Sequence, residues 1–201
     1  MTDLALDVRT LPTRPRGATA PEWWGIMALV CIEAVVFIGA IASYFHFKVR
    51  NPAWPPPGID APELLLPTLN TLLLVLSAVP IWLALRSFRR GRAGPARLGL
   101  PVGMGILVVF LALKLWEYTH KPWGATTHAY GSIVMLMTGL HIAHVTAVVL
   151  KTVVIHAYLR SGRIEPDRPA PLEANAVYWY FVVLVWLPLY ATIYLSPRLL
   201  P

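Results

Sequence analysis

The sequence predicts an all-α fold, a polytopic membrane protein built as a bundle of five transmembrane helices. Three observations carry this prediction. The 201 residues are 57% apolar and only 13% charged, whereas soluble domains carry about 25% charged residues. The mean hydropathy is +0.60. Five apolar runs, each with at most two charged residues, approach the 20 or so helical residues that a bilayer core of about 30 Å requires. A cytosolic enzyme is therefore excluded.

The predicted organisation is a polar amino-terminal tail over residues 1–22, followed by a single transmembrane domain over residues 23–201. The tail lacks an apolar core of signal-peptide length, so we expect it to be retained in the cytoplasm. The five spans cover about residues 24–46, 64–85, 98–118, 129–159 and 174–196. Pro80 and Pro188 lie inside spans, where each frees a backbone carbonyl, so we expect a kink in both helices.

Few charges interrupt the spans. The first contains Glu33, and the second contains none. The third holds Lys114 and Glu117 near its end, and we expect this pair to snorkel to the interface. The fourth is long enough to tilt or project, and its Lys151 is expected to snorkel toward the head groups.

The basic residues predict the orientation of the chain. Eleven lie in the tail, the second-to-third loop and the fourth-to-fifth loop, and four lie on the other side. The eleven are Arg9, Arg14, Arg16, Arg86, Arg89, Arg90, Arg92, Arg97, Arg160, Arg163 and Arg168, and the four are Lys48, Arg50, Lys121 and Arg198. We therefore predict a cytoplasmic amino terminus and a periplasmic carboxyl terminus. No basic stripe is interleaved with aromatics, so nucleic acid is not an expected partner.

Ionisable groups inside a bilayer are costly, so they are the candidate functional residues. Glu33 lies about 15 Å into the first span at 1.5 Å per residue. His141 and His144 lie at a similar depth in the fourth span, and their spacing puts them on one face. Glu33 is either a protonatable group touching a proton path or a lipid head group, or a carboxyl that hydrogen-bonds a neighbouring helix. For the histidines we favour hydrogen bonds between helices or to a lipid phosphate.

Neither a catalytic centre nor a metal site is predicted. Cys31 is the only cysteine, which excludes a disulfide framework and a thiolate site. Two histidines three residues apart on one helix cannot be opposite axial ligands of one haem. A di-metal site with Glu33 and Glu117 is disfavoured because Glu117 lies well off the level of Glu33. Nucleophile-elbow, phosphate-loop and His-Glu-x-x-His motifs are missing from the sequence.

A series of landmark residues runs through all five spans. In order they are Trp24-Gly25, Glu33-Ala34, Trp54 to Gly58, Leu66 to Leu72 with Asn70, Glu117-Tyr118, Tyr130-Gly131, His141, His144, Tyr178-Trp179 and Trp186. With this order and spacing, the chain after about Pro21 resembles subunit III of the haem-copper terminal oxidases, of which cytochrome c oxidase is the best-known member. It is most similar to the five-helix bacterial type.

The resemblance implies a non-catalytic accessory subunit of a respiratory haem-copper oxidase in a bacterial inner membrane. Such a subunit packs on subunit I, in a complex with subunit II, and binds structural phospholipid. It supports proton uptake and active-site stability during aerobic electron transport, while haem and copper belong to subunit I and this chain binds neither. Glu33 matches the family's buried, carbodiimide-reactive glutamate. His144 matches a histidine of the family near the lipid head groups, and Arg160 matches a basic residue that contacts lipid.

Two departures from the family pattern leave alternatives open. Tyr180 and Val183 stand where the fifth span of the family has His and Asp, and Ile142 replaces a close-packing glycine. These changes suggest a divergent branch, such as the subunit-III-like proteins associated with nitric oxide reductases. A small proton-coupled transporter is a further alternative, although the two halves of the chain show no internal repeat.

Overall fold

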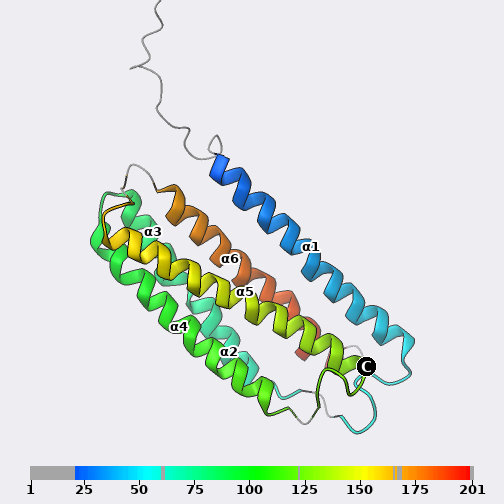
Figure 1. The fold of residues 1–201 in the computed structure, drawn as a ribbon. Helices are drawn as coiled ribbons and strands as arrows, with labels where there is room; N and C mark the ends of the chain where they lie inside the picture. Colours follow the sequence, from blue (N-terminus) through cyan, green and yellow to red (C-terminus); the bar gives the residue numbers. More distant parts are fainter. Residues whose placement is uncertain (1–20, 60–61, 122, 165, 167–168, 200–201) are drawn as a thin grey trace, which may run out of the picture.

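The computed structural model describes residues 21–59, 62–121, 123–164, 166 and 169–199, and over these ranges every regular element is helical. The elements are α1 (Pro21–Arg50), α2 (Leu65–Leu76), α3 (Ala78–Arg89), α4 (Ala93–Thr119), α5 (Ala129–Arg160), α6 (Ala170–Tyr190), the π-helical segment η3 (Ala191–Leu195) and α7 (Ser196–Leu199). Five helical stretches are long and apolar enough to cross a membrane, with α2–α3 and α6–α7 each forming one (Figure 1). The predicted all-α bundle of five spanning helices is thus confirmed, while its orientation stays a prediction.

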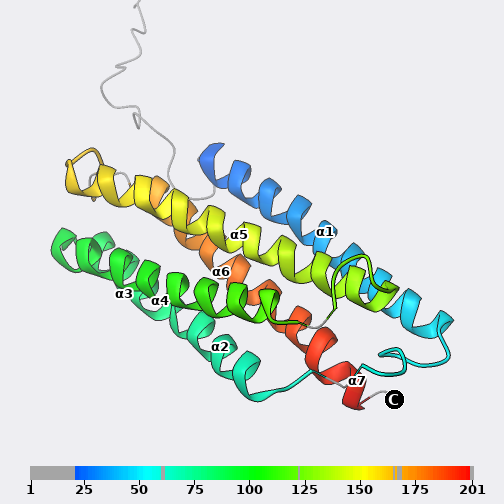
Figure 2. The same cartoon turned by 60° about the horizontal axis from the view of Figure 1, so that its bottom comes forward.

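The bundle is organised around α6. This helix packs against α1 and α5 on one side and against α2 and α3 on the other. The other large contacts join α4 to α2, α3 and α5, and α1 to α5. Helix α1 lies along an edge of the bundle in both views (Figures 1 and 2), where it packs mainly on α5 and α6. Much of the apolar surface of α1 is therefore left for lipid or for another protein.

The spans that contain Pro80 and Pro188 are both irregular, whereas α4 runs unbroken through its internal Pro101. The second span breaks at Ser77, three residues before Pro80, because the proline ring has no N–H to continue the helical ladder. The Ser77 hydroxyl donates to the Leu74 carbonyl at 2.6 Å. In the last span, the π-helical turns of η3 begin three residues after Pro188. Wider turns of this kind often accompany functional or strained positions in helices.

Two tryptophans of α6 tie the centre of the bundle together. Trp179 donates its indole N–H to the Ser77 hydroxyl at 3.0 Å, and Trp186 donates to the Thr71 hydroxyl at 2.8 Å. Both indoles are completely buried. A buried indole N–H without an acceptor would cost about 1–3 kcal/mol, so these hydrogen bonds fix the rotation of α6 against α2 and α3.

Candidate functional site

The candidate site lies where α1, α5 and α6 meet near the middle of the bundle. Glu33 comes from α1, His144 from α5 and Tyr178 from α6. The Tyr178 hydroxyl donates to Oε1 of Glu33 at 3.1 Å. Nε2 of His144 lies 3.6 Å from Oε2 of Glu33, and Oε2 is buried without a hydrogen bond among the described residues. The three side chains therefore form one polar cluster between three spans.

Glu33 and His144 face each other at 3.6 Å, slightly beyond hydrogen-bond distance, and one shared proton would fit the pair in two arrangements. Nδ1 of His144 lies 2.6 Å from the Leu140 carbonyl oxygen, which only accepts, so Nδ1 carries a hydrogen. If the ring is otherwise neutral, Nε2 is an acceptor and suits a protonated carboxyl; if the ring is charged, Nε2 is a donor and suits a carboxylate. The two arrangements differ only in the position of one proton. Its transfer between the carboxyl and the imidazole leaves the net charge of the pair unchanged. Such a pair avoids the cost of an isolated charge in an apolar medium.

The pair is open to one side of the bundle. The Glu33 and His144 side chains are 19% and 17% exposed, respectively. Phe37, one turn after Glu33 on α1, packs on the His144 ring with the ring centroids 4.9 Å apart. Lys151, two turns after His144 on α5, places its ammonium 5.1 Å from the centre of the Tyr178 ring. A ligand at this surface would meet apolar side chains together with the partly exposed side chains of Glu33 and His144, while Oε2 of Glu33 itself is buried.

His141 is separated from this cluster, although the sequence placed it on the same face as His144. Its ring is fully buried and lies 4.5 Å from the Trp186 ring. Nε2 donates to the Val182 carbonyl of α6 at 3.1 Å. Three residues on a helix differ by about 60° in direction, and this is enough to point His144 toward α1 and His141 toward α6. His141 thus makes a hydrogen bond between helices.

A second polar cluster corrects the expectation for Lys114. This lysine is 2% exposed and does not snorkel to the interface. Its ammonium donates to Oε2 of Glu117 at 2.7 Å and to the Tyr194 hydroxyl at 2.8 Å. The hydroxyl in turn donates to Oε1 of Glu117 at 2.6 Å. Lys114 stays buried because Glu117 and Tyr194 supply two acceptors and the rings of Trp186 and Tyr194 flank its charge.

The outer rim of this second cluster carries Lys121, which follows the end of α4. Its ammonium lies 3.5 Å from Oε1 of Glu117. Burial lowers the pKa of Lys121, and the carboxylate of Glu117 opposes that shift. The cluster joins α4 to η3 and has no described contact with Glu33, so we regard it as a structural clamp.

The other predicted residues lie apart from the Glu33 cluster. Arg160 is exposed at the end of α5, about 24 Å of helix from His144. Trp24 is 65% exposed on α1. The remaining landmarks are structural: the Asn70 amide donates to the Phe110 carbonyl at 3.3 Å, Trp54 packs on Tyr130 with the ring centroids 5.2 Å apart, and the Gly131 N–H donates to His128 at 2.7 Å.

The residues at the two departures from the family pattern lie on α6. Val183 is buried, and Tyr180 is partly buried with a hydroxyl that has no hydrogen-bond partner among the described residues. Neither belongs to the Glu33 cluster. Over the described ranges of the chain, no three His, Cys, Asp or Glu side chains are grouped as metal ligands would be.

Sequence reasoning missed the role of two side chains at the site. Tyr178 was a landmark without an assigned contact, because its pairing with Glu33 joins residues 145 positions apart. Lys151 lies seven residues, or two helical turns, after His144. This spacing is the sequence signal that could have placed Lys151 and His144 on one face of the helix.

The fold and the site together define a class: a multi-pass helical membrane protein with an acid–histidine pair between its spans. Comparison with known proteins is more specific. The sequence profile of the family "Cytochrome c oxidase subunit III" matches residues 18–197. The chain belongs to the cytochrome c oxidase subunit III family.

Individual relatives agree with this assignment. The chain is 32% identical over 175 residues to cytochrome c oxidase subunit 3 of Synechocystis sp., covering 86% of this chain and 74% of the relative. It is 27% identical over 175 residues to the protein of that name from Thermostichus vulcanus, covering 87% of each chain. The corresponding protein of Anopheles gambiae is 32% identical over 179 residues, covering 85% of this chain and 68% of the relative.

Proposed function

We propose that the chain is the non-catalytic subunit III of a bacterial respiratory haem-copper oxidase, held in the inner membrane against subunit I and in a complex with subunit II. The family match over residues 18–197 is the observation that carries this proposal. Haem and copper then reside in subunit I, where oxygen chemistry takes place. This chain contributes binding surface, lipid and a proton-holding pair to the assembled complex.

The Glu33–His144 pair supports proton uptake in this proposal. It lies near the middle of α1 and α5 and is partly exposed, and in this proposal it holds one proton in two isoelectric arrangements. Transfer of this proton within the pair changes no net charge, whereas uptake or release of a proton changes the charge of the pair by one. The partial exposure of both side chains makes that step less costly than full burial would. The Tyr178 hydroxyl fixes the orientation of the carboxyl. Proton exchange near subunit I keeps its supply of protons in step with turnover.

A structural phospholipid covers the pair in this proposal. Arg160 is exposed at the end of α5 and suits a lipid phosphate. One leaflet of hydrocarbon is about 15 Å deep, half of the bilayer core. Acyl chains that descend about 15 Å along α5 from the level of Arg160 cover most of the roughly 24 Å of helix between Arg160 and His144. The lipid then limits the access of water to the pair.

Glu33→Gln tests the proposal in the assembled oxidase. The amide keeps the size of the side chain and the hydrogen bond from Tyr178 but cannot exchange the proton. We expect normal assembly, loss of bound phospholipid, and a faster decline of oxidase activity during continuous turnover. Phospholipid is counted by mass spectrometry of the purified complex, and activity is followed as oxygen consumption.

The two tyrosines of α6 provide a matched control. Tyr178→Phe removes the hydroxyl that holds Glu33, whereas Tyr180→Phe removes a hydroxyl without a described partner. Only Tyr178→Phe should reproduce part of the Glu33→Gln effect. If Glu33→Gln leaves lipid content and activity decline unchanged in native lipid, the carboxyl serves packing alone and the proposed role is wrong.

A further inference from the structure

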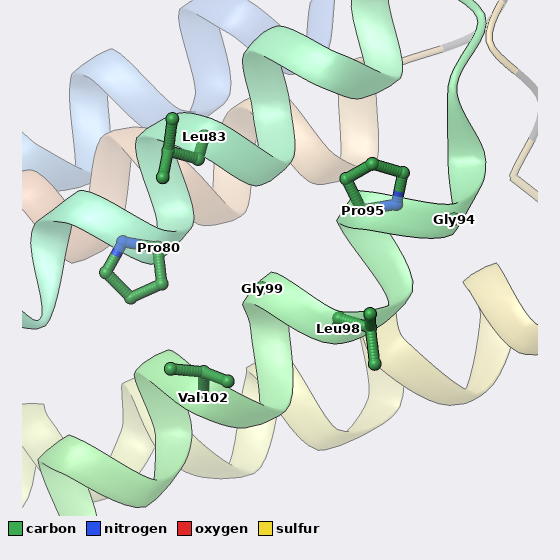
Figure 3. Close-up of a pocket in the computed structure, with 7 residues that line it drawn as sticks. All are labelled: Pro80, Leu83, Gly94, Pro95, Leu98, Gly99 and Val102. Atoms are coloured by element: carbon green, nitrogen blue, oxygen red, sulfur yellow. The ribbon is translucent and has the colours of Figure 1, made fainter.

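Charged side chains well inside the spans are confined to a few places in the described part of the chain. A depression between α3 and α4 has none, because its seven lining residues carry no polar side chain (Figure 3). Lys114 is neutralised by Glu117 at 2.7 Å. Lys151 is the other lysine well inside a span, and no carboxylate of the described residues lies within 4.0 Å of its ammonium. The role of this cation is therefore open.

Lys151 lies deep enough on α5 for its charge to be costly. It precedes the end of the helix at Arg160 by nine residues, about 14 Å of helix, and its side chain is only partly exposed. A cation at such a depth faces the interior of the bundle or finds a partner there.

The Lys151 ammonium makes its contacts with α6. It donates to the Ala174 carbonyl at 3.4 Å and lies 5.1 Å from the centre of the Tyr178 ring, one turn further along α6. A cation over an aromatic face is attracted by the ring electrons. These two contacts hold the ammonium beside the residue whose hydroxyl binds Glu33.

Tyr178 connects the cation to the carboxyl. Its hydroxyl donates to Oε1 of Glu33 at 3.1 Å, while its ring faces the Lys151 ammonium. A cation at the ring draws electron density from the phenol, which strengthens the hydroxyl as a donor to a carboxylate. The charges of Lys151 and Glu33 also act on each other. Both effects favour the ionised form of Glu33.

Few titratable groups of the described chain face Glu33. From α5 it meets His144, at 3.6 Å, and Lys151, and from α6 it meets Tyr178. Helix α1 adds no Asp, Glu, Lys, Arg or His within ten residues of Glu33. Glu173, the acidic residue of α6, is held by an arginine of α3 at 2.7 Å. Lys151 is thus the cation that can balance Glu33 when His144 is neutral.

We propose that Lys151 is the counter-charge of Glu33 and a positioning residue of the Glu33–His144 pair. It favours the carboxylate over the protonated acid, so that the shared proton resides on His144. When this proton leaves, the charges of Lys151 and Glu33 balance and the site is neutral, which lowers the cost of release in an apolar medium. The inference rests on the proposed function, because it concerns how the same pair releases its proton.

Infrared titration of the purified full-length chain in lipid nanodiscs tests the proposal. The readout is the carbonyl stretching band of protonated Glu33, identified as the band that Glu33→Gln removes. We expect Glu33 to be ionised at pH 7 in the unmodified chain. At an effective dielectric constant of about 20, a unit charge about 10 Å away changes a protonation equilibrium on the order of tenfold. Loss of the cation in Lys151→Met should therefore move the titration midpoint up by about one pH unit.

Two lysine variants provide matched controls. Lys151→Arg keeps the positive charge and should keep the unmodified midpoint. Lys48→Met removes the same charge from a lysine that also donates to a carbonyl of the last span, that of Ser196. Since Lys48 lies about 22 Å of helix from Glu33, this variant should leave the midpoint unchanged.

Three results would overturn the proposal. One is a protonated Glu33 at pH 7 in the unmodified chain, a result that does not depend on whether any Lys151 variant folds. Another is the same midpoint in Lys151→Met and the unmodified chain. The third is an equal shift in Lys48→Met. Oxidase activity does not enter the titration, so the charge assignment and the accessory role can fail separately.

Discussion

Gly99→Ala should separate α3 from α4 and destabilise the protein. The new Cβ would lie 2.7 Å from the Pro80 carbonyl oxygen and 2.9 Å from the Ala84 Cβ, against 3.4 Å for ordinary contact. Restoring ordinary contact to the oxygen requires a shift of about 0.7 Å, the difference between 3.4 and 2.7 Å. The Pro80 oxygen is a backbone atom of α3, and the Ala84 Cβ is bonded directly to that backbone. No flexible side chain can therefore move aside instead. Overpacking of this kind costs about 1–3 kcal/mol.

Helix propensity acts in the opposite direction. Alanine is favoured over glycine in a helix by about 1 kcal/mol, so the net cost of Gly99→Ala should be about 0–2 kcal/mol. Gly105→Ala on the same helix isolates the propensity term, because its Cβ would meet no atom within 4 Å. The difference between the two variants is therefore the packing cost alone, about 1–3 kcal/mol.

The assay is the thermal stability of the purified protein in one detergent, measured by the loss of monodisperse material on size exclusion after heating. We expect Gly105→Ala to be as stable as the unmodified protein or more so, and Gly99→Ala to be less stable than Gly105→Ala. Equal stability of the two variants would refute the reasoning, because it would show that α3 yields at no cost.

Two further substitutions test the buried polar contacts by the same thermal assay. Lys114→Met should cost about 3 kcal/mol because it leaves the Glu117 carboxylate without its shortest ion pair. The double variant with Glu117→Gln should recover most of that loss, and no recovery would argue against the pair. Ser77→Ala should cost about 1–3 kcal/mol by leaving the Trp179 indole N–H without its acceptor. The control Ser43→Ala affects only a bond to its own helix, and an equal loss there would contradict the assignment.

The number and type of the spans could be predicted from the sequence, because a bilayer imposes a minimum length and an almost complete exclusion of charge. The helix ends could not. Helix α4 begins at Ala93 instead of near residue 98, and α1 continues to Arg50. Helical hydrogen bonding continues past each apolar run into the polar turns that follow. The apolar pattern therefore does not predict the residue at which a helix ends. The break at Ser77 was foreseeable only as a kink near Pro80.

The candidate site was predictable in depth but not in pairing. Position along the two helices placed Glu33 and His144 at the same level, and the structure brings them within 3.6 Å. The partner Tyr178 depends on how α6 rotates against α1, which tertiary packing decides. Lys114 was misjudged for the same reason. A lysine near a span end snorkels unless acceptors and aromatic rings surround it, and here the Tyr194 hydroxyl and both rings come from the last span.

We propose above that this chain works as the accessory subunit of a haem-bearing oxidase. Affinity purification of the tagged chain from its native membranes in mild detergent tests this most directly, with the visible spectrum and the subunit composition of the product as readouts. We expect stoichiometric recovery of a haem- and copper-containing partner. Recovery of the chain alone, free of haem, from membranes that retain an active oxidase would contradict it.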